Sequence, residues 1–145
     1  MVRVLALDLG ERRVGVAVSD ATGTLASPRA TLIRSGDRAA DHRAVARLVA
    51  EEEVELVVVG WPRNMDGSEG PAARAAAAEA AVLAGLLGVP VELSDERLST
   101  VSAARALQAA GHDSRAQRRT IDQAAAAVIL QAWLDGRRRP GPGEF

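Results

Sequence analysis

The spacing of hydrophobic positions changes once along the chain, near residue 35. Before that point, short apolar runs rich in β-branched residues predict three consecutive strands, at 2–7, 14–18 and 24–33. After it, stretches with helical spacing alternate with short apolar runs. We therefore expect helices at 38–53, 71–87, 99–110 and 121–135, and strands at 56–60 and 89–93.

Local signals mark the ends of several of these elements. Ser35-Gly36-Asp37 is typical of a helix start, because a side-chain oxygen there can accept from a free backbone N–H. Pro71 fits the first position of the next helix, and Gly88 fits its stop. Pro28 interrupts the third strand, which predicts that this strand lies at a sheet edge.

The order of elements, β-β-β-α-β-α-β-α-α, predicts an α/β fold with a mixed five-stranded sheet flanked by helices. Strands that alternate with helices imply parallel pairing through right-handed crossovers, with the first strand at the centre of the sheet. A length of 145 residues suits one domain, which we expect to cover 1–136. The basic, Pro/Gly-rich segment 137–145 is predicted to be a disordered tail.

Composition narrows the classes of function. Apolar residues make up 48% and charged residues 26% of the chain, the balance of a globular protein. The sequence has no cysteine and two histidines, which excludes thiolate chemistry and disfavours a histidine-rich metal site. No apolar run reaches the roughly 18 residues that span a bilayer, and the N-terminus lacks a signal-peptide layout. We expect a cytoplasmic protein with no membrane partner.

Charge is balanced overall but uneven along the chain. The net charge of −1 argues against general binding of polyanions. All 18 basic residues are arginine, whose planar fork suits phosphate. Arginines gather at 115–119 and 137–139. The three aromatic residues leave little on which single-stranded nucleic acid could stack.

Acidic residues follow two predicted strands, and in open α/β sheets sites form beyond the carboxyl ends of the strands. Asp8 ends the first strand, and Asp95-Glu96 follow the fifth. Burial of a lone carboxylate costs free energy, so Asp8 needs a compensating partner. It is either an aspartate that caps the next turn, or a functional residue that acts as a metal ligand or general base. Only one of the later two acids can readily turn toward the site, and we choose Glu96, with Asp95 in reserve.

A third candidate acid is Asp122. The capping-box spacing of Thr120 and Gln123 predicts that the last helix starts at Ile121, so the helix dipole alone could explain an acid in the first turn. Asp122 also heads an inward stripe formed by Ala125, Ala126, Ile129 and Trp133. A carboxylate at the head of a buried stripe points toward the sheet, which favours a functional role.

Three converging carboxylates would repel one another unless a cation neutralised them. Oxygen ligands suit Mg²⁺ or Mn²⁺, so Asp8, Glu96 and Asp122 are predicted to be both the catalytic and the metal-binding residues. Such a site can hold two ions about 3.5–4 Å apart and support in-line hydrolysis of a phosphodiester. A metal-bound water would then be the nucleophile, and no side-chain nucleophile is needed.

Polar residues near these acids are candidates for substrate binding. The loop 60–67 (GWPRNMDG) lacks the lysine and hydroxyl of a P-loop, which excludes nucleotide hydrolysis by that route. Arg63 and Asn64 either contact phosphate or sugar or belong to a structural connection, and Arg97 either binds phosphate or forms a structural ion pair. Arg115, Arg118 and Arg119 either hold a nucleic-acid backbone or form a solvated connector.

Four segments of the chain resemble, in the same order, the four sequence blocks of the YqgF family. They are ALDLGERRVGVAVSD (6–20), GWPRNMDG (60–67), DERLST (95–100) and IDQAAAAVILQ (121–131). The family comprises Holliday-junction-resolvase-like proteins and pre-16S rRNA nucleases, and its conserved acids match Asp8, Glu96 and Asp122. The arginines at 115, 118 and 119 stand where lysine is frequent in the family, so the charge is retained.

The resemblance implies an RNase H-like fold, a cytoplasmic location and a metal-dependent nuclease. The implied role is maturation of the 5′ end of 16S rRNA, with structured RNA of the precursor ribosomal particle as partner. Alternatives remain open: a dimeric resolvase acting on branched DNA, or an RNA-binding assembly factor without catalysis. An actin-like ATPase is disfavoured because that fold needs two such domains. The chain is expected to be a monomer or a homodimer.

Overall fold

The structure is a computed structural model, which describes residues 2–99 and 115–138. The order of its elements confirms the predicted alternation. They are β1 (Val4–Leu9), β2 (Arg13–Ser19), β3 (Ala26–Ile33), α1 (Arg38–Glu51), β4 (Leu56–Trp61), α2 (Pro71–Leu86), β5 (Val91–Asp95), a 3₁₀ turn η1 (Glu96–Leu98) and α4 (Arg115–Arg138). The helix predicted at 99–110 lies, apart from its first residue, outside the described residues.

The strands form one five-stranded sheet in the order β3-β2-β1-β4-β5. β1, β2 and β3 pair antiparallel, whereas β4 pairs parallel with both β1 and β5. The mixed sheet with β1 at its centre is therefore confirmed. β3 lies at one edge, as Pro28 predicted, and its pairing with β2 is irregular at Val16/Ala17, next to the Ala17–Pro28 pair.

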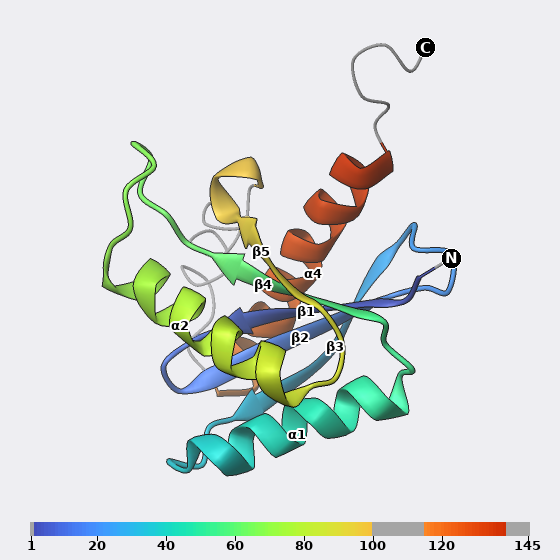
Figure 1. Cartoon of the computed structure of the whole chain (residues 1–145), viewed down its shortest axis with the longest axis horizontal. Helices are drawn as coiled ribbons and strands as arrows, with labels where there is room; N and C mark the ends of the chain where they lie inside the picture. The colour runs from blue at the N-terminus through green and yellow to red at the C-terminus, as the bar shows by residue number, and fades with distance from the viewer. Residues whose placement is uncertain (1, 100–114, 139–145) are drawn as a thin grey trace.

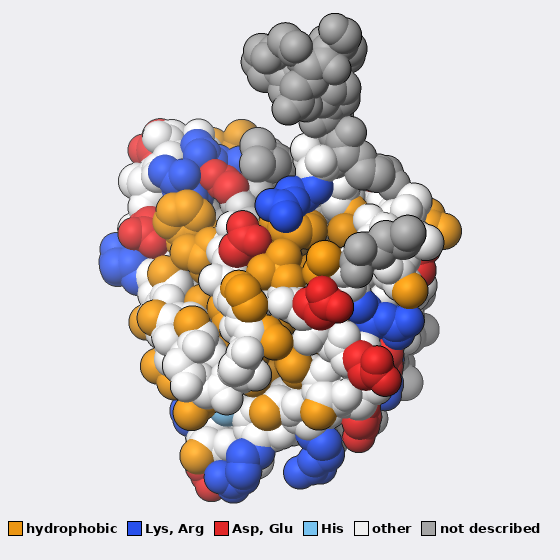
Figure 2. All heavy atoms as spheres, turned by 45° about the vertical axis from the view of Figure 1, so that its right-hand side comes forward, with side chains coloured by type: hydrophobic (Ala, Val, Ile, Leu, Met, Phe, Trp, Pro, Cys, Tyr) orange, Lys and Arg blue, Asp and Glu red, His pale blue; other side chains and the backbone are white. Residues whose placement is uncertain are grey.

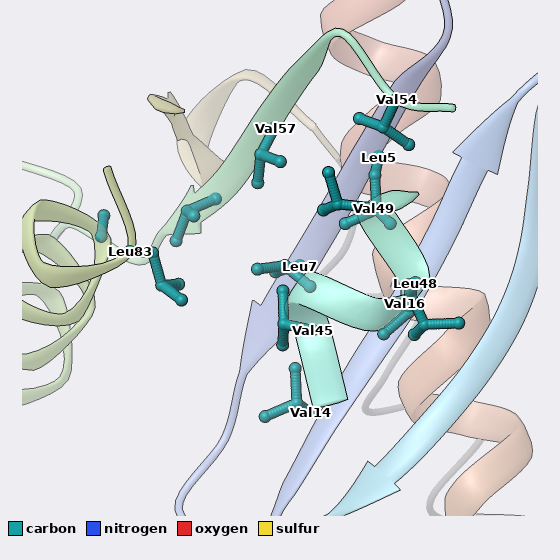
Figure 3. Close-up of a cluster of buried hydrophobic side chains, with 12 residues drawn as sticks. Leu5, Leu7, Val14, Val16, Val45, Leu48, Val49, Val54, Val57 and Leu83 are labelled. Atoms are coloured by element: carbon teal, nitrogen blue, oxygen red, sulfur yellow. The ribbon is translucent and has the colours of Figure 1, made fainter. Parts of the chain in front are cut away.

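The helices cover the two faces of the sheet, as Figure 1 shows, with α1 and α2 on one face and α4 on the other. Side chains of β1 alternate between these faces. Leu5 and Leu7 pack with Val45 of α1 and Leu83 of α2 (Figure 3). Val4 and Ala6 instead pack against a cluster on α4 that contains Ala126, Leu130 and Leu134. The period-two alternation of a strand thus supplies a core to both layers.

Helix ends follow the local signals at three positions. Asp37 caps α1, because its side chain accepts hydrogen bonds from the backbone N–H groups of Ala39 and Ala40. α2 begins at Pro71 and ends at Leu86. Gly88 then adopts a φ of +72°, a left-handed conformation that favours glycine.

The start of the last helix differs from the prediction. α4 begins at Arg115, so Asp122 lies about two turns inside it rather than in the first turn. Thr120 and Gln123 are both helical, and neither a capping box nor the helix dipole accounts for Asp122. At its other end the helix continues to Arg138, two residues beyond the predicted end of the domain at residue 136.

The surface carries mixed charge. On the face shown in Figure 2, acidic and basic side chains are interspersed with apolar ones. This agrees with a net charge of −1. None of the helices that the structure describes has the length and apolarity needed to cross a membrane.

Candidate active site

The end of β1 brings Asp8 to the face of the sheet that α4 covers. Val4 and Ala6 point to that face, and Asp8 follows them at the same two-residue spacing. Its side chain is half-buried at the carboxyl end of the strand. Asp8 is therefore placed where sites form in sheets of this kind.

Gly15 brings Asp122 next to this position. Gly15 pairs with Asp8 across β1 and β2. A Cβ at Gly15 would lie 2.1 Å from the backbone oxygen of Asp122 and 2.6 Å from its carbonyl carbon. Since no side chain tolerates such an approach, glycine is required where α4 crosses β2. The glycine within the VGVAV run is the signal in the sequence, but its partner could not be known from it.

Gly60 has the same role for Glu96. Leu7 pairs with Val59, so Gly60 continues β4 beside Asp8. A Cβ at Gly60 would lie 2.8 Å from Oε2 of Glu96 and 2.8 Å from Cδ1 of Ile129, a residue of α4. The Glu96 side chain therefore fills the space left by this glycine, on the α4 side of the sheet. Glu96 is 8% exposed, so it is the acid that turns inward, as expected.

Asp8, Glu96 and Asp122 thus come from distant parts of the chain to one end and one face of the sheet. Their side chains do not, however, form a ready ligand set. Within residues 2–99 and 115–138, no group of three histidine or acidic side chains is arranged to hold a metal ion. The sequence predicted the placement of the acids, but the conformation described here lacks the ligand geometry.

Arg13 explains part of this difference. Its Nε lies 2.5 Å from Oδ2 of Asp122, and the two side chains are 31% and 17% exposed. Arg13 is the first residue of β2, two positions before Gly15, and it therefore points to the α4 face. Arg13 could not be identified from the sequence, because the contact joins residues 109 positions apart.

Asp95 binds Arg63 and Arg97, two of the five arginines that are candidates for substrate binding. Its Oδ2 accepts from Nη2 of Arg97 at 2.7 Å and from Nη1 of Arg63 at 3.2 Å. Its Oδ1 accepts from the backbone N–H of Arg97 at 2.9 Å. Hydrogen bonds from Arg97 are the main cause that lowers the pKa of Asp95. Asp95 is therefore an anionic anchor for two guanidinium groups, which remain 26% and 29% exposed.

The loop after β4 is built around these two guanidinium groups. Arg63 donates to the backbone oxygen of Gly67 and lies over the Trp61 ring, 4.4 Å from its centroid. A Cβ at Gly67, whose φ is +90°, would lie 3.2 Å from Nη2 of Arg63 and 3.3 Å from Nη1 of Arg97. Asn64 binds within the loop, through Nδ2 to Oγ of Ser68 at 3.0 Å. The loop thus holds both arginines in place.

The three arginines before Asp122 belong to a helix rather than to a connector. Arg115, Arg118 and Arg119 occupy the first turns of α4. The connector interpretation is therefore wrong, because the helix begins six residues earlier than the predicted start at Ile121. The side chains of these three arginines lie outside what the structure describes.

A buried ionic cluster supports the turn after β1. Glu79 of α2 accepts from both terminal nitrogens of Arg34 at 2.9 Å, and Nη1 of Arg38 forms an ion pair with its Oε1 at 2.6 Å. His42 is buried, and its Nε2 lies 2.8 Å from Oε2 of Glu79. Burial raises the pKa of Glu79, but hydrogen bonds from Arg34 and His42 outweigh it and lower this pKa to about 2. Arg34 also donates to the backbone oxygen of Gly10 at 2.7 Å.

Known proteins resemble this chain over most of its length. The family model described as "RuvX: Holliday junction resolvase" matches residues 2–136. A relative from Myxococcus xanthus (strain DK1622), named "Putative pre-16S rRNA nuclease", is 51% identical over 138 residues, which cover 95% of this chain and 91% of the relative. A relative of the same name from Anaeromyxobacter dehalogenans (strain 2CP-C) is 50% identical, with 95% and 99% of the two chains covered.

Among solved structures, a similar one is "T. thermophilus RuvC in complex with Holliday junction substrate". It superposes with a TM-score of 0.58 at 18% sequence identity, and the match covers 94% of this chain and 96% of that one. At this identity the likeness concerns the fold, and it confirms the predicted RNase H-like architecture.

The fold and the relatives together define a nuclease of the RNase H-like class, a hydrolase that cleaves phosphodiester bonds. The chain belongs to the RuvX family, the family that the four sequence blocks indicated under the name YqgF.

Proposed function

We propose that this chain is a divalent-metal-dependent nuclease that processes the 5′ end of pre-16S rRNA. The observation that carries the proposal is the placement of Asp8, Glu96 and Asp122 at one end of the sheet, through the close approaches at Gly15 and Gly60. The name shared by the relatives supports precursor 16S rRNA as the substrate. A cytoplasmic location belongs to the same proposal, since the substrate is ribosomal RNA.

The residues suit a hard cation by their chemistry. Carboxylate oxygens are preferred ligands of Mg²⁺ and Mn²⁺, and Glu96 brings a buried carboxylate into the space that a side chain at Gly60 would fill. Asp8, Glu96 and Asp122 would hold the ion. Because Arg13 binds Asp122 in the structure, side chains must rotate before all three acids can act together. A cation bound there would activate water for attack on phosphorus.

Arg63 and Arg97 are the substrate-binding residues that the geometry supports best. Two guanidinium groups share one carboxylate, Asp95, which is followed directly by Glu96, and both guanidinium groups stay partly exposed. Their exposed nitrogens can donate to the oxygens of a phosphodiester. Further proposed contacts, which rest on the sequence, are Asn64, Arg115, Arg118 and Arg119.

Cleavage of a precursor transcript tests this function. We expect the purified chain with Mg²⁺ to cut a 16S precursor near its mature 5′ end. Asp8→Asn and Asp122→Asn should each lower the rate at least about 100-fold, because each removes a metal ligand. Glu92→Gln, which changes an exposed acid of β5, should cleave like the wild type. Equal cleavage by all four proteins would point to a contaminating nuclease and contradict the proposal.

Resolution of branched DNA is a second candidate, favoured by the family description and by the likeness to RuvC over most of both chains. It requires a symmetric dimer with two sites on one side. Light scattering with a four-way junction separates the two functions, because a strict monomer on the junction contradicts the resolvase. Retention of precursor RNA without turnover at saturating Mg²⁺ would instead indicate a binding factor.

A further inference from the structure

Arg13 and Asp122 form a charged contact inside the candidate active site. Nε of Arg13 donates to Oδ2 of Asp122 over 2.5 Å, and because both groups are charged the contact is a charge-assisted one. Gly15 fixes the backbone of Asp122 against β2, two residues from Arg13. The backbone of Asp122 therefore cannot move away from Arg13 without separating the helix from the sheet, and only side-chain rotation can break the contact.

A guanidinium on a carboxylate oxygen neutralises the same charge that a metal ion would neutralise. The two cations therefore compete, since one oxygen cannot keep a short bond to Arg13 and also be a full ligand of the ion. In the part of the chain that the structure describes, Arg13 holds Asp122 and the three acids are not arranged as a metal-binding group.

The surroundings of the pair permit exchange. The side chain of Arg13 is 31% exposed and that of Asp122 is 17% exposed, so water can replace either partner. The pair between Arg34 and Glu79 shows the opposite case. Its side chains are 9% and 6% exposed, and His42 and Arg38 also bind the same carboxylate. That cluster is suited to hold the fold, whereas the pair in the active site can open.

We propose that Arg13 is a built-in counter-ion that competes with the divalent metal for Asp122. The proposal rests on the function proposed above, a metal-dependent nuclease. In the metal-free protein Arg13 neutralises Asp122 and so limits repulsion among the acids. The strength of this contact also sets the metal concentration at which the site fills.

Binding of Mn²⁺ to the full chain, followed by electron paramagnetic resonance and by titration calorimetry, tests the competition directly. Arg13→Ala should bind Mn²⁺ about three- to tenfold more tightly than the wild type, since the competing hydrogen bond is lost. Arg12→Ala is the matched control. It removes the same charge from the neighbouring position, and in the described part of the chain the exposed Arg12 side chain has no hydrogen bond or ion pair. Its affinity should stay within about twofold of the wild type.

Two further variants separate competition from other effects. Arg13→Ala should gain no affinity for Mn²⁺ in an Asp122→Asn background, because the coupled partner is absent. Arg13→Gln keeps much of the side-chain volume and gives the same comparison if Arg13→Ala does not fold. Without metal, the melting temperature of the Arg13 variants should fall, and it should rise more on addition of Mn²⁺ than that of the wild type.

Mn²⁺ affinity of Arg13→Ala that equals or falls below that of Arg12→Ala would overturn the inference. If the wild type still cleaves precursor RNA in a metal-dependent manner, the proposed function stands and only the role of Arg13 fails. Absence of both Mn²⁺ binding and metal-dependent cleavage in the wild type would overturn both.

Discussion

Gly15 lies directly against the backbone of Asp122, where a methyl group would come within 2.1 Å of the carbonyl oxygen. This contact joins β2 to α4 and places Asp122 beside the Asp8–Gly15 pair. Gly60 places Glu96 in a comparable way, but the atom it meets is the end of a side chain. Gly15 therefore contacts backbone, which cannot adjust locally, whereas Gly60 contacts side chains that can rotate. Substitution of the two glycines should have different effects.

Substitution of Gly15 should damage both the fold and the activity. Gly15→Ala forces α4 away from β2, because two backbones cannot adjust as a flexible side chain can. We expect a loss of about 3 kcal/mol or more in the free energy of unfolding, measured by urea denaturation, together with loss of cleavage. The control is Gly136→Ala in α4, where the added Cβ has no atom within 4 Å. This substitution should leave the stability unchanged or raise it slightly. Equal stability of the two variants would contradict the account.

Gly60→Ala should affect activity more than stability. The new methyl group meets Oε2 of Glu96 and Cδ1 of Ile129, both at the ends of side chains that can rotate. The free energy of unfolding should fall by about 1–2 kcal/mol, while cleavage should fall at least tenfold because Glu96 is displaced. Melting curves and initial rates measure the two effects. A rate that matches the wild type would show that the position of Glu96 is unimportant.

Asp95→Asn should weaken substrate binding rather than the binding of metal. Loss of the shared carboxylate releases Arg63 and Arg97 from their fixed positions. We expect KM for precursor RNA to rise about three- to tenfold, with a smaller change in kcat. Affinity for Mn²⁺ should stay within about twofold of the wild type. A large loss of Mn²⁺ affinity would mean that Asp95 is a metal ligand and that its anchoring role is secondary.

The cluster around Glu79 predicts a defined dependence of stability on pH. The pKa of Glu79 is lowered to about 2 in the folded protein, from the ordinary glutamate value of 4.5. A carboxyl with a lowered folded pKa stabilises the fold above its unfolded pKa, and this stabilisation is lost as pH falls from about 4.5 toward about 2. Glu79→Gln should therefore cost about 2–3 kcal/mol at pH 7 and progressively less at pH 4 and pH 3. Urea denaturation at these values measures the difference, and a cost that does not change with pH would exclude the linkage.

The sequence predicted best those features that depend on neighbouring residues. The cap at Asp37, the start at Pro71 and the stop at Gly88 are local, and the structure confirms all three. The spacing of Thr120 and Gln123 is equally local, but it misled, because a longer helix can include a capping pattern in its interior. Local signals therefore locate an element more reliably than they locate its first residue.

The site was only partly predictable for a related reason. The position of an acid at a strand end can be read from the sequence, as it was for Asp8 and Glu96. The residues that bring the acids together cannot, because Gly15 and Arg13 act through α4, more than 100 positions away. The ion pair of Arg97 with Asp95 was one of two alternatives in the sequence, and the structure shows that this pair forms.

Mn²⁺ affinity of three single variants, Asp8→Asn, Glu96→Gln and Asp122→Asn, tests most directly whether the three acids form one cation site. Each change keeps the shape of the side chain and removes one charge. We expect each variant to fold with a wild-type circular dichroism spectrum and to bind Mn²⁺ at least tenfold more weakly. Glu92→Gln should bind like the wild type. Wild-type affinity in any one of the three folded variants would contradict the shared site.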